Sequence, residues 1–458
     1  MTDTIAAVST PRGVGGVALI RISGADAVSV TSRVFFPASG RDLKDVPHSS
    51  AVYGRIVEDG VNIDDGIATV FYAPRSFTGE NTVEITCHGG VYVTGRVLSA
   101  VLAAGARPAL PGEFTRRAFI SGKLSLSEAE AVGDLLYAKT EGQMLLSGSA
   151  SAFLLSDKVD AISKSLTSLI ARVSVTIDYP EEDLSDIGTS ELRERISELL
   201  SGVKSLVSSY KTGRAVTEGI NAVIVGRPNA GKSTLYNLLL GEDAAIVTDI
   251  AGTTRDTLSA DVSAGKVLLR LSDTAGIRST DDVIESMGVD RARDRASGAE
   301  LLIAVFDATS APTAEDSEII SLGGAVKLAI INKTDAADAE YVAEYEKIAA
   351  VSGADVIYAS LKNGDGRDTL IEKIEAEFTD PKIELGRDAV VANARQAAEA
   401  RCALESLASA LGALDAGLPV DIVSGELESA LSALMRLDGR EVTDAVIGEI
   451  FSKFCVGK

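Results

Sequence analysis

The chain contains 458 residues, of which 46% are hydrophobic. This length and composition predict about three globular domains and exclude a disordered chain. The 66 acidic residues outnumber the 44 basic ones, which gives a formal net charge of -22. This charge argues against broad, unaided binding to a phosphate backbone, because such binding needs clustered Lys and Arg. It leaves room for a nucleic acid held by a basic partner protein.

Cysteine use and hydropathy favour a reducing compartment. Cys87, Cys402 and Cys455 lie far apart and form no CxxC pair, so we expect neither a disulfide framework nor a zinc site. Residues 1–10 lack the basic start and the apolar core of a signal peptide. The sequence has no uncharged apolar run of about 18 residues, so no membrane span is expected. We therefore expect a cytoplasmic protein.

Residues 1–123 are predicted to form a small α/β domain. Runs of β-branched residues are separated there by Gly, Pro and Asp, which favour turns. The predicted strands are Ile5–Val8, Val17–Ile22, Ala51–Val57, Ala68–Tyr72 and Val83–Thr86. A helix is predicted over Val91–Ala104, ending near Gly105.

Two helical blocks, 124–217 and 380–458, flank a second α/β segment at 218–379. Residues 125–128 form a capping-box pattern, and apolar residues then recur at spacings of three and four. The acidic, proline-containing stretch 178–183 interrupts the first block and is expected to be a solvated loop. We interpret the two blocks as one discontinuous helical domain that carries an inserted domain.

The inserted segment alternates strands and helices, which predicts a mostly parallel sheet. Its predicted strands are Asn221–Val225, Val267–Ser272, Leu301–Phe306, Lys327–Ile331 and Val356–Tyr358.

The stretch 226–233, GRPNAGKS, matches the G-x-x-x-x-G-K-[ST] phosphate loop. It follows a predicted strand and precedes a leucine-rich helix, a context that disfavours the alternative of a glycine-rich turn without function. We expect Lys232 to reach the β- and γ-phosphates and the Ser233 hydroxyl to bind Mg²⁺.

The stretch Asn332-Lys-Thr-Asp335 favours guanine as the base, since it follows a predicted strand about 100 residues after the phosphate loop. The Asp335 carboxylate can accept two hydrogen bonds from the guanine ring N–H and amine, whereas adenine has no donor at those places. The aliphatic stem of Lys333 can cover the face of the base. Residues 360–362 are expected to close over the guanine edge.

Two further stretches complete the expected site. Asp273-Thr-Ala-Gly276 follows a strand, where an acid can hold Mg²⁺ through water and the Gly276 N–H can sense the γ-phosphate. The polar stretch 248–256 should supply a threonine, most plausibly Thr254, to the Mg²⁺ shell. Ile277 stands where many switch GTPases place the glutamine that orients water, so we expect another group to do this.

These motifs together resemble the tRNA modification GTPase family known as MnmE or TrmE. The resemblance extends over the full chain. It is carried by GRPNAGKS, TDIAGTTRD, DTAGIR, NKTD, the terminal Phe454-Cys-Val-Gly-Lys458 and an N-terminal set: Asp3–Ala6, Gly15–Val17, Arg21–Gly24, Ser76–Glu80, His88–Gly90 and Pro111–Phe114.

The resemblance implies a K⁺-activated GTPase in which the inserted Ras-like domains dimerise. In that scheme K⁺ is bound by Asn229, Thr248, Ile250 and Thr253, and Glu285 positions the attacking water through a bridging water. On the residues alone, Asn229 could also be an ordinary turn residue. Lys232, Asn229 and Glu285 are the expected catalytic residues. The expected GTP contacts are Asn229, Ala230, Gly231, Lys232, Ser233, Thr234, Thr248, Asp249, Ile250, Ala251, Gly252, Thr253, Thr254, Asp273, Thr274, Ala275, Gly276, Asn332, Lys333, Asp335, Ser360, Leu361 and Lys362.

The resemblance also implies that the N-terminal domain mediates homodimerisation and binds a folate, of the 5,10-methylene- or 5-formyl-tetrahydrofolate type. Its expected contacts are Arg21, Glu84, Lys123 and Lys458, although each of these alone could be a surface charge. A nucleophilic role for the Cys455 thiol is conceivable, but no base accompanies it in the sequence.

A flavin-dependent partner, MnmG (GidA), is implied as well, in a heterotetramer or a larger complex. Together the two proteins would add a (carboxymethyl)aminomethyl group to C5 of the wobble uridine of certain tRNAs. A GTP switch in ribosome assembly is the alternative, but such a factor is expected to carry a basic RNA-binding appendage. An ATP-using enzyme is disfavoured by NKTD.

Overall fold

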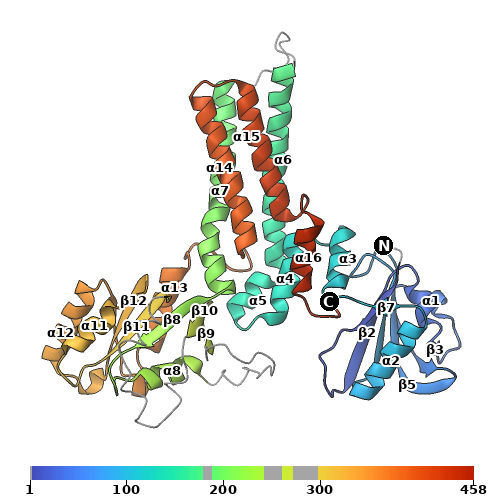
Figure 1. The fold of residues 1–458 in the computed structure, drawn as a ribbon, viewed down its shortest axis with the longest axis horizontal. Coiled ribbons are helices and arrows are strands. Elements are labelled where there is room, and N and C mark those ends of the chain that lie inside the picture. The colour runs from blue at the N-terminus through green and yellow to red at the C-terminus, as the bar shows by residue number, and fades with distance from the viewer. Residues whose placement is uncertain (1–2, 179–187, 242–259, 272–297) are drawn as a thin grey trace. The chain divides into compact units, whose positions relative to one another are not determined.

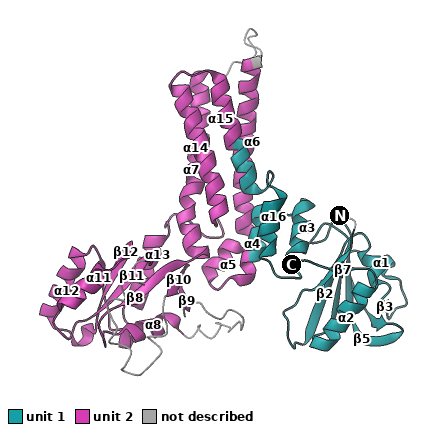
Figure 2. Ribbon diagram, in the orientation of Figure 1, with its two compact units in different colours: residues 1–133, 431–458 teal, residues 134–430 magenta. Residues whose placement is uncertain are grey.

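The computed structural model describes residues 3–178, 188–241, 260–271 and 298–458. The chain divides into two compact units, one formed by residues 1–133 and 431–458 and the other by residues 134–430 (Figure 2). These units group the C-terminal residues with the N-terminal segment. The four-part division at 123, 217 and 379 remains a prediction.

The first unit contains a seven-stranded sheet in the order β3-β4-β5-β6-β2-β1-β7 (Figure 1). All neighbouring strands are antiparallel except β1 and β7. The strands are β1 Ile5–Val8, β2 Val17–Ser23, β3 Phe35–Pro37, β4 Ser50–Glu58, β5 Val61–Phe71, β6 Thr82–His88 and β7 Arg107–Pro108. The five predicted strands are confirmed. The sequence did not predict β3 and β7, which have only three and two residues and therefore no readable alternation.

Helices α1 (Ala27–Thr31) and α2 (Val91–Ala103) pack on this sheet, and the predicted helix at 91–104 is confirmed. The unit also contains α3 (Glu113–Ile120) and α16 (Asp444–Ser452). Helix α4 (Leu126–Tyr137) begins in this unit with the predicted capping box. There the Ser125 N–H donates to Glu128 Oε2 at 2.6 Å and the Glu128 N–H donates to Ser125 Oγ at 3.2 Å.

Long helices make up one part of the second unit. They are α5 Glu141–Ser147, α6 Ser149–Asp178, α7 Thr189–Thr217, α14 Ala394–Asp415 and α15 Val420–Asp438, whose last turns belong to the first unit. Helices α7 and α14 pack together although the inserted segment separates them in sequence (Figure 1). The predicted apolar stripe of α7 is buried, whereas on α14 Leu407 and Leu414 are buried and Leu404 and Leu411 are only half-buried. The expected acidic loop lies outside the described residues from 179 onward.

The other part of the second unit is a six-stranded sheet in the order β13-β12-β11-β8-β10-β9. Its strands are β8 Ile220–Val225, β9 Ala260–Ala264, β10 Val267–Leu271, β11 Leu301–Asp307, β12 Val326–Asn332 and β13 Asp355–Tyr358. All neighbours are parallel except β9 and β10. The mostly parallel sheet and its five predicted strands are confirmed. The short strand β9 was missed, since its sequence ADVSA is rich in small residues.

Helices cover both faces of this parallel sheet. α8 (Lys232–Leu240) and α13 (Arg367–Phe378) bury apolar side chains against one face, and α11 (Ala314–Ser321) and α12 (Ala339–Val351) cover the other. The central strand β11 is therefore buried on both sides, which explains its continuous apolar run. Among the described helices, none is long and apolar enough to cross a membrane.

Candidate functional site

Three predicted motifs follow parallel strands of the same sheet and meet at its carboxyl edge. The phosphate loop follows β8, the NKTD stretch begins at the last residue of β12, and residues 360–362 follow β13. Ligands of open α/β sheets bind outside the carboxyl ends of parallel strands. The fold therefore brings the three motifs to the expected place for a ligand.

Two glycines of the phosphate loop are required by close backbone approaches. Gly226 has φ +153°, and a Cβ there would lie 2.4 Å from the Val305 carbonyl oxygen. Gly231 has φ +112°, and a Cβ there would lie 2.3 Å from Asn332 Nδ2. Asn229 also has a left-handed backbone, with φ 62°. The loop can follow this path only with glycine at its two ends, which is the physical content of the motif.

Helix α8 begins directly after the loop, with Gly231 as its N-cap. Lys232 Nζ donates to the Arg227 carbonyl oxygen at 2.8 Å, so its side chain folds back across the loop. Ser233 and Thr234 are exposed on the first turn. A lysine, two hydroxyls and the positive end of a nine-residue helix form a cradle suited to phosphate.

The Asn332 side chain ties the three motifs together. It is 3% exposed; its Nδ2 donates to the Ala230 carbonyl oxygen at 2.7 Å and its Oδ1 accepts from the Leu361 N–H at 3.0 Å. Asn332 was predicted as a GTP contact. The structure shows its amide bonded to the backbone of the two neighbouring loops, so it fixes their separation.

The Asp335 carboxylate is oriented by the loop after β13. Ser360 Oγ donates to Asp335 Oδ1 at 2.6 Å, and this hydrogen bond lowers the pKa of Asp335. Asp335 is exposed and stays ionised at neutral pH, so it can accept hydrogen bonds from a base. Lys333 has a left-handed backbone and its Nζ lies 2.6 Å from Asp307 Oδ2. The Leu361 side chain is buried, and Lys362 is exposed.

Several predicted site residues lie outside the described residues. They are Thr248, Asp249, Ile250, Ala251, Gly252, Thr253, Thr254, Asp273, Thr274, Ala275, Gly276, Ile277 and Glu285. Among the predicted metal ligands, only Ser233 and Asn229 are described, and both are exposed near the start of α8.

In the first unit, two of the predicted folate contacts form an ion pair on neighbouring strands. Arg21 of β2 faces Glu84 of β6 in register, and a guanidinium nitrogen of Arg21 lies 2.8 Å from Glu84 Oε1. The guanidinium carbon also lies 5.2 Å from the ring centroid of Phe77 and 5.8 Å from that of Phe114. Both distances allow cation–π contacts. Phe77 and Phe114 belong to stretches that carry the family resemblance, but they were not predicted as folate contacts or as neighbours of Arg21.

The C-terminal tail lies against the same part of this unit. The Phe114 N–H donates to the Lys458 carbonyl oxygen at 3.2 Å, and Ser9 Oγ donates to that of Gly457 at 2.9 Å. Gly457 has φ +102°, and a Cβ there would lie 2.3 Å from the Val8 carbonyl oxygen. The tail therefore brings Lys458 to Phe114, which also contacts Arg21.

The predicted folate contact Lys123 and the tail residue Cys455 make fewer contacts. The backbone N–H of Lys123 donates to the Ala118 carbonyl oxygen at 2.9 Å, and its exposed side chain passes beside Gly79. Cys455 is exposed, and its carbonyl oxygen accepts from the Gly112 N–H at 3.3 Å.

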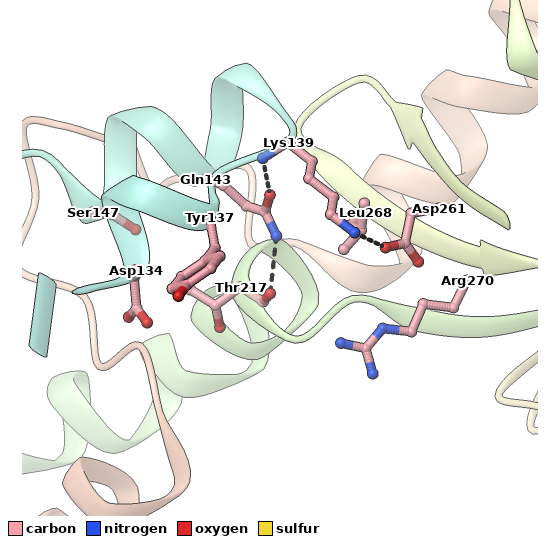
Figure 3. A pocket seen from close by; sticks show the side chains of 9 residues that line it. All are labelled: Asp134, Tyr137, Lys139, Gln143, Ser147, Thr217, Asp261, Leu268 and Arg270. Atoms are coloured by element: carbon pink, nitrogen blue, oxygen red, sulfur yellow. Dashed lines mark hydrogen bonds and ion pairs between the residues drawn. The ribbon is translucent and has the colours of Figure 1, made fainter. Parts of the chain in front are cut away.

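A separate cavity of about 230 Å³ lies between the helical part and the sheet of the second unit (Figure 3). Lys139 Nζ lies 2.6 Å from Asp261 Oδ2 across it. Gln143 connects α5 to the end of α7, because its Nε2 donates to the Thr217 carbonyl oxygen at 3.0 Å. Its Oε1 accepts from the Lys139 N–H, just before α5, at 2.7 Å. Both signs of charge face the cavity. We interpret it as a polar joint between the β9–β10 hairpin and α5.

Two family models match the chain over nearly its whole length. The model of the MnmE helical domain matches residues 126–455, and that of the GTP-binding protein TrmE N-terminus matches residues 4–123. A protein of Carboxydothermus hydrogenoformans named tRNA modification GTPase MnmE is 39% identical over 462 residues, covering 100% of both chains. Proteins of the same name from Ligilactobacillus salivarius and Geobacillus kaustophilus are each 40% identical, and the matches cover 100% of this chain and 98% and 99% of the relatives.

Solved structures match part of the chain at low similarity. Era of Aquifex aeolicus bound to GDP and AlF4- is 25% identical with a TM-score of 0.27, covering 41% of this chain and 66% of Era. The G domain of the FeoB iron transporter of T. maritima is 23% identical with a TM-score of 0.24, covering 35% of this chain and 98% of that domain. Scores this low support no argument about the present chain.

Proposed function

Because the chain belongs to the MnmE family of tRNA modification GTPases, we propose that it binds GTP at the carboxyl edge of the parallel sheet and couples hydrolysis to modification of the wobble uridine. The chain is a GTP hydrolase that acts in tRNA modification. The observation that carries the placement of the base is the Asp335 carboxylate, fixed by Ser360 beside the phosphate loop.

The phosphates of GTP would lie in the cradle at the start of α8. The glycines at 226 and 231 leave the backbone N–H groups of the loop unobstructed, and the helix N-terminus favours negative charge. Lys232 is folded over this loop and would exchange its carbonyl partner for the β- and γ-phosphates. Asp335 would select guanine, since an adenine would leave the carboxylate without donors.

Of the proposed cation ligands, the structure describes Ser233 and Asn229, which are both exposed beside this cradle. Ser233 with Thr254 would hold Mg²⁺, and Asn229 with Thr248, Ile250 and Thr253 would hold K⁺. A cation at that place supplies positive charge against the charge that develops on the phosphates during hydrolysis. Asn229 suits the role, because its left-handed backbone and exposed side chain lie within the loop itself. Glu285 would orient the attacking water in place of the absent glutamine.

For the first unit we propose a tetrahydrofolate site of the 5,10-methylene or 5-formyl type. A carboxylate such as Glu84 suits the N–H donors of a pterin, and cations such as Arg21, Lys123 and Lys458 suit a glutamate tail. The contacts that bring Arg21 and Lys458 to Phe114 support this grouping. We also propose that the chain forms a homodimer through this domain and a complex with flavin-dependent MnmG. Because the chain is acidic, MnmG would supply much of the tRNA-binding surface. This complex would act in the cytoplasm.

GTP hydrolysis in different alkali cations tests the nucleotide half of this proposal. We expect a far higher rate in K⁺ than in Na⁺, and equal rates would remove Asn229 from its role. Glu285→Ala should slow hydrolysis and leave GTP affinity nearly unchanged. A large loss of affinity would instead assign Glu285 to binding.

Binding of 5-formyltetrahydrofolate to the full chain, with and without Lys458, tests the other half. We expect measurable binding that weakens on deletion of Lys458. Absence of binding in both proteins would contradict the folate site while leaving the GTPase activity unaffected.

A further inference from the structure

Asp307 forms a saturated cluster of hydrogen bonds beside the NKTD stretch. It ends β11 and lies opposite Asn332 in the parallel register. Asp307 Oδ2 accepts from Lys333 Nζ at 2.6 Å, and Oδ1 accepts from Thr309 Oγ1 at 2.7 Å and from the Thr309 N–H at 3.0 Å. Asp307 belongs to none of the motifs recognised in the sequence.

The side-chain conformation of Lys333 is not fixed by its own backbone or by packing. Its φ of 63° lies in the left-handed region, which is strained for a residue that carries a Cβ. Its side chain is a flexible four-carbon stem that loses rotamer freedom when it is held in one place. With 38% of the side chain exposed, packing alone does not fix it. The ion pair to Asp307 supplies the missing constraint.

We propose that Asp307 is a positioning residue for nucleotide binding, which holds the stem of Lys333 along the sheet edge as a preformed surface for the guanine face. This inference rests on the proposed placement of guanine between Lys333 and Asp335. Because the ammonium is already bonded to Asp307, less side-chain freedom is lost when the base arrives, which strengthens binding.

The charge of Asp307 is suited to this task. Burial alone raises the pKa of its carboxyl group, but the hydrogen bonds from Lys333 and Thr309 outweigh burial and lower the pKa. Asp307 is therefore ionised at neutral pH and makes a charge-assisted bond to the ammonium. Of the pair, Asp307 is the less exposed partner at 21%.

The surrounding backbone does not depend on this side chain. The Ala308 N–H donates to the Asn332 carbonyl oxygen at 3.1 Å, and the Asp338 N–H donates to the Ala308 carbonyl oxygen at 3.2 Å. These bonds keep the ends of β11 and β12 together when the carboxylate is changed. An isosteric amide at 307 should therefore fold, and it isolates the interaction with Lys333.

The test is steady-state GTP hydrolysis by the full chain, with Asp307→Asn and Lys333→Met combined in a double-mutant cycle. Asp307→Asn should raise KM for GTP by about 5- to 20-fold with kcat unchanged. It should weaken the binding of GDP and of GTP by the same factor. Lys333→Met should also raise KM, and adding Asp307→Asn to it should change nothing further. A merely structural role would lower kcat as well as raise KM, and both changes would persist in the Lys333→Met background.

Asp355→Asn is the matched control. It removes another ion pair of the same sheet, in which Lys373 Nζ lies 3.1 Å from Asp355 Oδ2, and should leave KM unchanged. Thr309→Val removes one bond to the Asp307 carboxylate from an exposed loop position and should raise KM about 2- to 3-fold. This second variant keeps the test decisive if Asp307→Asn does not fold.

The outcomes separate this inference from the placement of guanine. A raised KM in Lys333→Met together with a wild-type KM in Asp307→Asn would overturn the role of Asp307 alone. A wild-type KM in Lys333→Met would overturn the role of Asp307, because the methionine stem can still cover the base, and would leave the placement of guanine at Asp335 to its own test. If Asp307→Asn raised KM by the same factor in the wild type and in Lys333→Met, Asp307 would not act through Lys333.

Discussion

The two candidate sites are built in different ways. The candidate nucleotide site is formed by backbone at the ends of parallel strands of one sheet, with glycines where a Cβ would meet Val305 or Asn332. The candidate site in the first unit joins segments that are distant in sequence, because the Phe114 ring contacts Arg21 and the Phe114 N–H donates to the Lys458 carbonyl oxygen. A site of the first kind is determined by local sequence, whereas the second kind depends on where a distant segment packs.

The largest expected effect is loss of nucleotide binding in Gly231→Ala. The added Cβ would lie 2.3 Å from Asn332 Nδ2, at a backbone with φ +112°. Either the phosphate loop or the Asn332 side chain therefore has to move. We expect affinity for a fluorescent GDP analogue to fall more than about 100-fold, roughly 3 kcal/mol. Gly353→Ala is the control, because it has φ +68° and no atom within 4 Å, and it should keep the affinity. Similar losses in both variants would contradict a steric cause.

The first unit should instead show a large effect on stability. Glu113, whose side chain is 5% exposed, bonds to Arg107 and Arg117. Burial opposes its ionisation, but the bonds from Arg107, the Leu110 N–H and Arg117 outweigh burial and lower the pKa of Glu113 from 4.5 to about 2. Because the pKa of Glu113 is lower in the folded state than in the unfolded state, its ionised carboxylate stabilises the folded protein above the unfolded-state pKa. This stabilisation is lost as the pH falls through about 4.5 toward 2.

Urea unfolding of the wild type and of Glu113→Gln between pH 7 and pH 3 measures this contribution. The wild type should be more stable by about 2 to 3 kcal/mol at pH 7, and the difference should shrink steadily below about pH 4.5. A difference that does not change with pH would contradict the role of the charge.

An intermediate effect is expected from Gly457→Ala, which separates the two sites. The Cβ would lie 2.3 Å from the Val8 carbonyl oxygen and displace the tail. We expect affinity for 5-formyltetrahydrofolate to fall about 10-fold, or about 1.4 kcal/mol, and GTP affinity to stay unchanged. Gly448→Ala on α16 has no atom within 4 Å and serves as the control. Unchanged folate affinity in Gly457→Ala would remove the tail from the site.

The smallest effect is expected at the joint between the helical part and the sheet. The ion pair of Lys139 and Asp261 has side chains 62% and 26% exposed. Exposed pairs contribute about 0 to 1 kcal/mol and are screened by salt. Lys139→Ala should lower the thermal midpoint by at most a few degrees at low salt, with less effect at high salt. A larger loss that does not depend on salt would show that Lys139 acts through packing.

The sequence predicted much of the nucleotide site because its spacing reports backbone geometry. The structure confirms the strands, and it shows that the glycine loop and Asp335 follow strands of one parallel sheet, whereas their roles in nucleotide binding stay a prediction. It did not predict that Asn332 bonds to the Ala230 and Leu361 backbone, because that contact depends on the spacing of two loops in the folded chain. Asp307 was missed for a similar reason, since an acid at a strand end has no distinctive local pattern.

In the first unit, the strands were predictable from alternation, whereas Phe77 and Phe114 were not predicted as neighbours of Arg21. Both stand in polar stretches, at residues 75–80 and 112–116, where no local pattern relates an aromatic ring to an arginine on a strand. The path of the C-terminal tail could not be predicted from the sequence either, because no local pattern relates Gly457 to Val8, which it approaches closely.

The most direct test of the central claim is the nucleotide preference of Asp335→Asn, measured by competition of GTP and xanthosine triphosphate for the full chain. An amide in place of the carboxylate presents an N–H to the donors of guanine but complements the oxygen of xanthine. We predict that GTP affinity falls by about 100-fold or more and that the variant prefers xanthosine triphosphate. A variant that still prefers GTP would contradict the placement of guanine at Asp335.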